Sequence, residues 1–339
     1  MKIGKLDNKT LDRLVLSKFH ATRKESMGAP QVGQDCATLD FGSDLIVASC
    51  DPITSAEWEH LGALTVHVNC NDSASAGAEP VGLLVTLLMP PNGTEEQIDR
   101  IANDLRDAAR TANVDILGGH TEVTASVSRP VTCTTVLARA PRDNAFLKPQ
   151  ADDALVLTKW AGLEGTMLAA TDFAHLLPSL TEEQIARCRS FSSYLSVVPE
   201  SKIALQNGVS AMHDVTEGGV LGAVWELASL YGLGAKIDYA AIPLLPETIA
   251  VCEAVSLDPA RFISSGAMLI ACRDGDRMCA ALQQNSIHAT VIGAFTERDF
   301  CLTDGTFFEP PGADELYKLF DLAKEKGISE KLLPQQKRI

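Results

Sequence analysis

Three aspartates in the first quarter of the sequence carry the first chemical signal. Asp35 stands in Gly-Gln-Asp-Cys-Ala, Asp51 in Cys-Asp-Pro and Asp72 in Asn-Asp-Ser, each at the edge of an apolar segment. Hard cations such as Mg²⁺ take oxygen ligands, and a few carboxylates with substrate phosphates are enough to hold one. The three acids together indicate a metal and phosphate site. A single aspartate near a strand end is commonly a turn or cap residue, and that interpretation stays open for each acid alone.

A hairpin and a helix would bring these acids together. Residues 36–41 and 45–50 have strand character and flank a Gly-Ser-Asp turn, so we expect Asp35 and Asp51 at one end of a hairpin. Residues 61–76 are rich in small residues and repeat apolar positions at helical spacing. Asp72 then falls in the last turns of a helix and can join the other two acids.

Cysteines accompany the acids and raise the question of thiol chemistry. Cys36 and Cys50 each adjoin an aspartate, and Cys70 lies two residues from Asp72. Neighbouring side chains on a strand point to opposite faces, so a cysteine beside an aspartate that faces a site is expected to point into the core. No Cys-x-x-Cys pair occurs, which argues against a disulfide scaffold or a zinc site.

Charge and hydropathy exclude several classes of function. The formal net charge is −15 and no cluster of Lys and Arg stands out, which disfavours nucleic-acid binding. No apolar run is long enough to cross a bilayer, and the first residues lack the apolar region of a secretory signal, so we expect no membrane partner and a cytoplasmic location.

The first portion of the chain alternates strand and helix patterns, which predicts an α/β or α+β fold. An apolar run at 81–89 reads as a buried strand, 94–111 as a helix, and 114–117 and 131–138 as further strands. A polar stretch broken by proline, 141–153, is the best domain boundary. We therefore expect an N-terminal domain over 1–145, a C-terminal α/β domain over 150–320 and a charged tail over 321–339.

The second portion repeats this mixture of elements. We expect a strand at 155–158, a glycine-rich turn at 162–165 leading into a helix at 166–175, and a strongly apolar helix at 220–230. Residues 267–271 and 289–295 supply further buried strands.

Two glycine-containing segments add candidate site residues. Gly118-Gly119-His120-Thr121 follows a strand that we expect to be buried, and could leave backbone amides open to a phosphate, although a plain tight turn fits as well. In the segment from His213 to Gly219, Thr216 could equally be a helix N-cap or a ligand. His120 is a better candidate than His67, which lies inside the predicted helix 61–76.

Taken in order, these motifs resemble the aminoimidazole ribonucleotide (AIR) synthase superfamily, and the match runs over nearly the whole chain. The branch that it most resembles is the HypE-like hydrogenase-maturation branch. The motifs that carry the resemblance are Gly33-Gln34-Asp35-Cys36-Ala37, Cys50-Asp51-Pro52, Asn71 to Pro80, Gly118-Gly119-His120-Thr121, His213 to Gly219, Val251-Cys252-Glu253, Leu257-Asp258-Pro259 and Ser265 to Leu269.

The resemblance implies an architecture and a site. The N-terminal domain would pair with its copy to close a β-barrel across a homodimer, and the C-terminal domain would cover a nucleotide. ATP and Mg²⁺ are the implied cofactors. The implied metal ligands are Asp35, Asp51 and Asp72; the implied nucleotide-binding residues are Asn71, Gly118, Gly119 and Thr121; and the implied catalytic residues are Asp72, His120 and Asp214.

The function that the resemblance implies is a HypE-like, ATP-dependent enzyme that activates an amide, thioamide or similar acceptor by phosphorylation. The acceptor would be an unidentified small molecule or a group carried by a protein. Alternatives are a thiamine-monophosphate-kinase-like or AIR-synthase-like metabolite enzyme, and a nucleotide-binding regulatory protein without turnover. The chain departs from the family at His120, where Asp is common, at Ser265, where an acid is common, and at Arg338-Ile339, where HypE has a cysteine.

Overall fold

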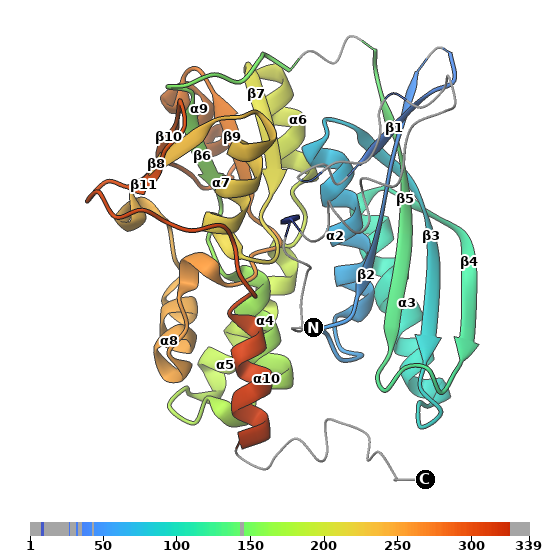
Figure 1. Cartoon of the computed structure of the whole chain (residues 1–339). Coiled ribbons are helices and arrows are strands. Elements are labelled where there is room, and N and C mark those ends of the chain that lie inside the picture. The colour runs from blue at the N-terminus through green and yellow to red at the C-terminus, as the bar shows by residue number, and fades with distance from the viewer. Residues whose placement is uncertain are drawn as a thin grey trace.

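The computed structural model describes residues 8–9, 27, 32, 36–42, 44–142 and 146–325. These residues form two mixed sheets with helices packed on them, one sheet in each half of the chain (Figure 1). The predicted α/β fold class is confirmed. Asp35 lies outside the described residues.

The first sheet has the order β1-β2-β5-β3-β4. Its β1 and β2 form the predicted antiparallel hairpin, with Ala37 opposite Ala48. Only β3 and β4 run parallel, because a helix connects them. The strands are β1 (Ala37–Asp40), β2 (Leu45–Ile53), β3 (Glu79–Met89), β4 (Asp115–Val123) and β5 (Val131–Ala140).

Two helices pack on the first half, and they differ in environment. α3 (Glu95–Ala112) begins with a capping box between Thr94 and Gln97 and buries a single apolar stripe. α2 (Leu61–Ser75) is buried along its length from Leu61 to Ala74. The reason is that α2 contacts β2, β3 and β5 of the first sheet and also β7 and α6 of the second half. α2 is therefore the helix that joins the two halves (Figure 1).

The second sheet has the order β11-β8-β10-β6-β9-β7, and only β11 and β8 pair in parallel. Its strands are β6 (Ala154–Thr158), β7 (Val209–Asp214), β8 (Gly234–Ile237), β9 (Met268–Cys272), β10 (Ala289–Thr296) and β11 (Phe300–Leu302). The α-helices of this half are α4 (Leu163–Asp172), α5 (Glu182–Arg189), α6 (Val198–Gln206), α7 (Gly219–Leu230), α8 (Pro246–Val255), α9 (Gly275–Gln284) and α10 (Leu316–Glu325).

The tight turn that was one alternative for Gly118-Gly119-His120-Thr121 is wrong, because these residues continue β4. Both glycines have positive φ, 146° and 141°. A Cβ atom on Gly119 would collide with the backbone oxygen of Val85 on β3, so glycine permits the close approach of the two strands. β4 is also exposed along its whole length, whereas we expected the strand before the glycines to be buried.

Cys50 does not point into the core, so the prediction that it would do so is wrong. It faces the opposite side of β2 from Asp51, as strand alternation requires. That side of the first sheet is covered by no described element of this chain, and Cys50 is exposed there with its Sγ 3.7 Å from that of Cys133. Cys36 and Cys70 are buried as predicted.

None of the helices in the described part of the chain combines the length and apolar character needed to cross a membrane.

Candidate active site

Asp72 lies where α2 packs against β2. Its carboxylate is almost completely buried, and Oδ2 accepts a hydrogen bond of 2.8 Å from the hydroxyl of Ser49 on β2. A buried ionised carboxylate is costly unless it is paired with a donor or a cation. The buried position of Asp72 is therefore the kind of place where a carboxylate binds a cation.

Asp51 lies on the same face of β2 as Ser49, two residues further along. Residues two apart on a strand are separated by about 7 Å, which places Asp51 beside the contact between Ser49 and Asp72. The backbone N–H of Asp51 donates to Oδ1 of Asn69 on α2, at 3.1 Å, and the residue is half-buried. Two of the three predicted metal-binding acids thus meet at one seam.

Asp214 joins this seam from the second half of the chain. It is the last residue of β7 and is buried, and its Oδ1 lies 3.3 Å from the hydroxyl of Ser75. That same hydroxyl donates to the backbone oxygen of Asp72 at 2.8 Å. The hydroxyl of Ser75 therefore contacts both Asp72 and Asp214.

The helix after β7 starts later than Thr216. Gly218, with φ of 87°, is the N-cap of α7, and the backbone oxygen of Thr216 accepts from the N–H of Gly219 at 3.1 Å. Thr216 is therefore not the N-cap, one of the two alternatives that the sequence left open. The other alternative, a ligand role, stays a prediction.

A small cavity of about 210 Å³ opens beside Asp72. It is smaller than the typical ligand pocket of roughly 300–1,000 Å³, so it has room for one part of a ligand rather than a whole nucleotide. Both halves of the chain line it: Cys36, Asp72, Ser75, Ala76, Phe146, Met212, His213, Leu227, Leu230 and Tyr231.

The remaining predicted site residues on β4 lie elsewhere in the single chain. Gly118, Gly119, His120 and Thr121 are exposed, and β4 is three strands away from β2 in the sheet order. With a strand spacing of about 4.8 Å, that separation is about 14 Å. Nε2 of His120 lies 3.0 Å from a carboxylate oxygen of Glu122.

Both polar side-chain atoms of Asn71 form hydrogen bonds with the backbone of the second half of the chain. Its amide nitrogen donates to the oxygen of Leu195 at 2.8 Å, and its Oδ1 accepts from the N–H of Val197 at 2.9 Å. In this structure Asn71 therefore clamps α2 to the segment before α6. Its predicted nucleotide-binding role stays a prediction.

Lys159 holds the same segment and was not found from the sequence. Its buried ammonium donates to the backbone oxygens of Tyr194 and Ser196 and lies 2.7 Å from Glu200. Burial lowers the pKa of Lys159, while Glu200 acts in the opposite direction. A single lysine after a strand has no motif that would reveal this role. On α2, burial lowers the pKa of His67 to about 4, and the positive charge of Lys159 makes a smaller contribution in the same direction.

Three acids lie at the N-terminal ends of α4, α7 and α10, and none of them was named as a site residue from the sequence. Asp314 accepts from three backbone N–H groups, of Gly218, Ile263 and Leu316, and burial raises its pKa to about 7. Glu217 accepts from the hydroxyl of Tyr317 at 3.0 Å.

Glu164 is the third of these acids, and its only sequence signal was its place in the glycine-rich turn 162–165. Burial raises the pKa of Glu164 to about 7, and hydrogen bonds from Ser265 act against that shift. Ser265 is the position where the resemblance leads us to expect an acid. The structure therefore places a carboxyl group from a different element in hydrogen-bond contact with Ser265.

A Mg²⁺ ion fits the acids at the α2–β2 seam chemically. Asp51 and Asp72 supply hard oxygen ligands, and Mg²⁺ is commonly bound through one or two carboxylates together with phosphates and waters. Within the described residues no group of three or more His, Cys, Asp or Glu side chains is arranged as a complete metal site. The described residues therefore supply two carboxylate ligands, and the remaining ligands would come from a bound phosphate and from water.

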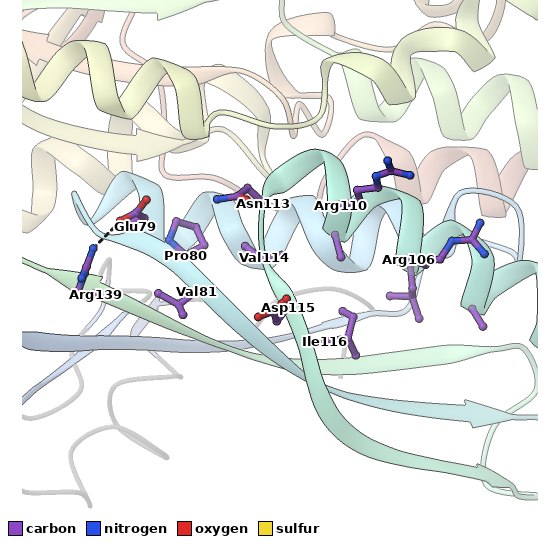
Figure 2. Close-up of a pocket in the computed structure, with 13 residues that line it drawn as sticks. Glu79, Pro80, Val81, Arg106, Arg110, Asn113, Val114, Asp115, Ile116 and Arg139 are labelled. Atoms are coloured by element: carbon purple, nitrogen blue, oxygen red, sulfur yellow. Dashed lines mark hydrogen bonds and ion pairs between the residues drawn. The ribbon is translucent and has the colours of Figure 1, made fainter.

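A larger, open groove lies away from this seam, between α3 and the starts of β3 and β4 (Figure 2). Its floor is apolar, and Arg106 and Arg110 stand at its rim. Arg139 closes one end through its ion pair with Glu79, at 3.2 Å. None of the predicted site residues lines it.

Comparison with family models covers most of the chain. Residues 33–140 match the N-terminal domain of AIR synthase related proteins, and residues 150–301 match the C-terminal domain. The chain belongs to the AIR synthase related protein family. The two matched domains of this family contain all of the candidate site residues named above except Asp314.

Curated relatives from this family carry hydrogenase-maturation names. Carbamoyl dehydratase HypE of Cupriavidus necator is 30% identical over 231 residues, which span 66% of this chain and 63% of the relative. A putative hydrogenase expression/formation protein of Methanocaldococcus jannaschii is 25% identical over 310 residues, 87% of this chain and 89% of that protein. The match thus spans less than two thirds of the first of these AIR synthase related proteins.

Solved structures share the AIR synthase related fold. A HypE–HypF complex superposes with a TM-score of 0.72 at 20% identity, covering 91% of this chain and 100% of that chain. ThiL complexed with AMPPCP and TMP gives 0.71 at 18%, covering 92% and 99%. HypE in complex with ATP gives 0.67 at 19%, covering 93% and 98%. At these identities the likeness establishes the fold.

Proposed function

We propose that this protein is an ATP-dependent, HypE-like enzyme that activates an amide, thioamide or similar acceptor by phosphorylation. The observation that carries the proposal is the position of Asp72, buried between the two halves and linked to β2 through Ser49 and to Asp214 through Ser75. The curated names of relatives, and the ATP and AMPPCP bound to structural neighbours, support it.

Asp51 and Asp72 would hold Mg²⁺, which supplies compensation for the negative charge of the triphosphate. The protein then contributes mainly position. Ser49 donates to the carboxylate of Asp72, and Asn69 accepts from the backbone N–H of Asp51. Both residues lie on a strand or helix rather than on a loop. Asp214 brings the C-terminal half against the same point, so a bound nucleotide would touch both halves.

We infer that the site is completed by a second copy of the chain. The side of the first sheet opposite α2 exposes the large apolar side chain of Leu84, and the edge strand β4 exposes Leu117 and Val123. Apolar surface of this kind marks an interface. We infer that a homodimer covers this face, and that Gly118, Gly119, His120 and Thr121 act in the site of the partner copy, since they lie far from Asp51 in their own chain.

The test is isothermal titration with a non-hydrolysable ATP analogue, with and without Mg²⁺, on the wild type and on Asp72→Asn. The asparagine keeps an acceptor for Ser49 but removes the charge, so we expect Mg²⁺-dependent binding to weaken at least about tenfold, the scale of losing one charge-assisted contact.

Asp99→Asn, on the exposed face of α3, is the matched control and should bind as the wild type does. Binding by the wild type that needs neither Mg²⁺ nor Asp72 would place the nucleotide elsewhere. The absence of any binding by the wild type would contradict the proposed activity.

A further inference from the structure

Glu164 is a buried carboxyl group that the proposed nucleotide site does not use. It lies in the first turn of α4 with 5% of its surface exposed. Ser265 approaches it with both its hydroxyl and its backbone N–H. The other oxygen, Oε2, has no hydrogen-bond partner among the described residues. A buried oxygen without a partner costs free energy in the folded protein, so a native structure that keeps one calls for an explanation.

The backbone around Glu164 is held rigidly. The N–H of Gly162 donates to the hydroxyl of Ser264 at 2.6 Å, and the N–H of Gly165 donates to the oxygen of Ile263 at 2.9 Å. The start of α4 is thereby fixed to the segment 262–266. The backbone that carries Glu164 therefore cannot shift without breaking these contacts.

The neighbours of Glu164 connect it to the boundary between the two halves on two sides. Next to Ser265, Gly266 packs against the backbone of Tyr194 and Leu195, and Leu195 is the residue that Asn71, the neighbour of Asp72, binds. On its other side, the charges that act on Glu164 are those of Asp314 and Glu217. Glu217 accepts from Tyr317, whose hydroxyl also meets Ser55, just after β2.

We propose that Glu164 is a catalytic carboxyl group that takes the proton from the acceptor as the acceptor attacks ATP. This deepens, and rests on, the proposed function. The acceptor is then a neutral group that bears N–H, S–H or O–H. Its proton moves to Oε2 of Glu164, a bond forms between the acceptor atom and the γ-phosphorus, and the bond from that phosphorus to the bridging oxygen of ADP breaks. Product release returns the proton to water.

The environment suits this role. Burial, together with the charges of Asp314 and Glu217, raises the pKa of Glu164 to about 7, against hydrogen bonds from Ser265. A group with a pKa near the working pH can both accept and release a proton, which is the condition for general base catalysis. The other two acids are occupied, Asp314 by three backbone N–H groups and Glu217 by Tyr317, so the unpartnered oxygen of Glu164 is the acceptor that remains.

The first measurement is chemical labelling of the full-length protein with diisopropylcarbodiimide, which modifies protonated carboxyl groups, followed by peptide mass spectrometry. We expect Glu164 to be modified at pH 6 and progressively less as the pH rises through about 7. Glu200 is the matched control, because it is also buried but its carboxyl group lies 2.7 Å from the ammonium of Lys159. A Glu164 that resists the reagent across pH 5–8 overturns the inference.

The second measurement is ADP release from Mg-ATP with water as the acceptor, compared between the wild type, Glu164→Gln and Glu164→Asp. Loss of a general base costs about 100-fold or more, so Glu164→Gln should fall by that factor and lose the rise in rate near pH 7, while Glu164→Asp recovers part of it. The affinity for the ATP analogue should not change. A Glu164→Gln variant with the wild-type rate and pH profile overturns the inference.

The two proposals fail in different ways. If the wild type binds no nucleotide analogue, the proposed function falls, and the catalytic role of Glu164 falls with it. If the wild type binds the analogue through Asp72 and Glu164 is neither labelled nor needed for turnover, only the role of Glu164 is lost.

Discussion

Buried carboxyl groups set how this protein responds to pH, and Asp172 is the clearest case outside the candidate site. It ends α4 and accepts from the backbone N–H of Glu57 at 3.3 Å, across the boundary between the halves. Burial is the main cause that raises its pKa to about 7, well above its ordinary value. The folded protein therefore binds a proton here at pH values where the unfolded chain has lost it.

The sign of the effect on stability follows from this difference. The stabilising contribution of protonated Asp172 is complete below about pH 4 and is lost as the pH rises through about 7, at up to about 1.4 kcal/mol per pH unit. Asp172→Asn keeps an acceptor for Glu57 but cannot ionise. We expect a higher free energy of unfolding than the wild type at pH 8 and little difference at pH 4.5, measured by urea denaturation. Equal pH slopes for the two proteins would contradict this assignment.

At the level of single residues, the sequence identified acids whose neighbours in the chain are distinctive. Asp51 and Asp72 stand beside apolar segments, and the structure brings them to one seam. Glu164 and Asp172 could not be found in that way, because their unusual properties come from burial against segments about 100 residues away in the chain, Ser265 and Glu57. Burial of this kind is decided by tertiary packing, and no local pattern encodes it.

Among the elements, β4 makes the most specific demand on the sequence. Both of its glycines have positive φ, but only at Gly119 would a Cβ atom meet the backbone of β3; at Gly118 nothing lies within 4 Å. Backbone strain of this kind costs about 1–3 kcal/mol for an L-residue. Gly118→Ala should carry that cost, and Gly119→Ala should carry it together with a steric clash.

Amide hydrogen exchange along β3 and β4 measures this difference. We expect faster exchange in Gly119→Ala than in Gly118→Ala, because only the former pushes the two strands apart. Equal protection in the two variants would mean that backbone strain alone, without the steric clash, determines the stability of the β3–β4 pairing.

Local signals explain which elements were predicted. The hairpin of β1 and β2 follows from its turn residues, and α3 follows from its capping box and single apolar stripe. β4 was misjudged, because a Gly-Gly pair indicates a turn unless the neighbouring strand is known. α2 was located correctly, but its periodicity did not show that both of its sides are buried.

At the level of the whole molecule, the uncovered face of the first sheet predicts self-association. Leu84 stands on that face with 43% of its surface exposed, and Ile249 on α8 is similarly exposed at 41%. A buried charge without a partner strongly disfavours an interface. Leu84→Glu should therefore shift the protein from dimer to monomer in sedimentation velocity, whereas Ile249→Glu, the matched control, should remain dimeric. A Leu84→Glu protein that still sediments as a dimer would place the interface elsewhere.

The burial of α2 has a consequence for any attempt to divide this protein. One side of the helix belongs to the first sheet, and the other is held by Asn71 and by Ser201, whose hydroxyl donates to the backbone of Ala74 at 2.6 Å. Cutting the chain between residues 142 and 146 would expose one side of α2 to solvent. The surface that it contacts on the other fragment would also be exposed. The fragments should precipitate when expressed singly and dissolve when co-expressed, so the unit that folds here is the pair of domains.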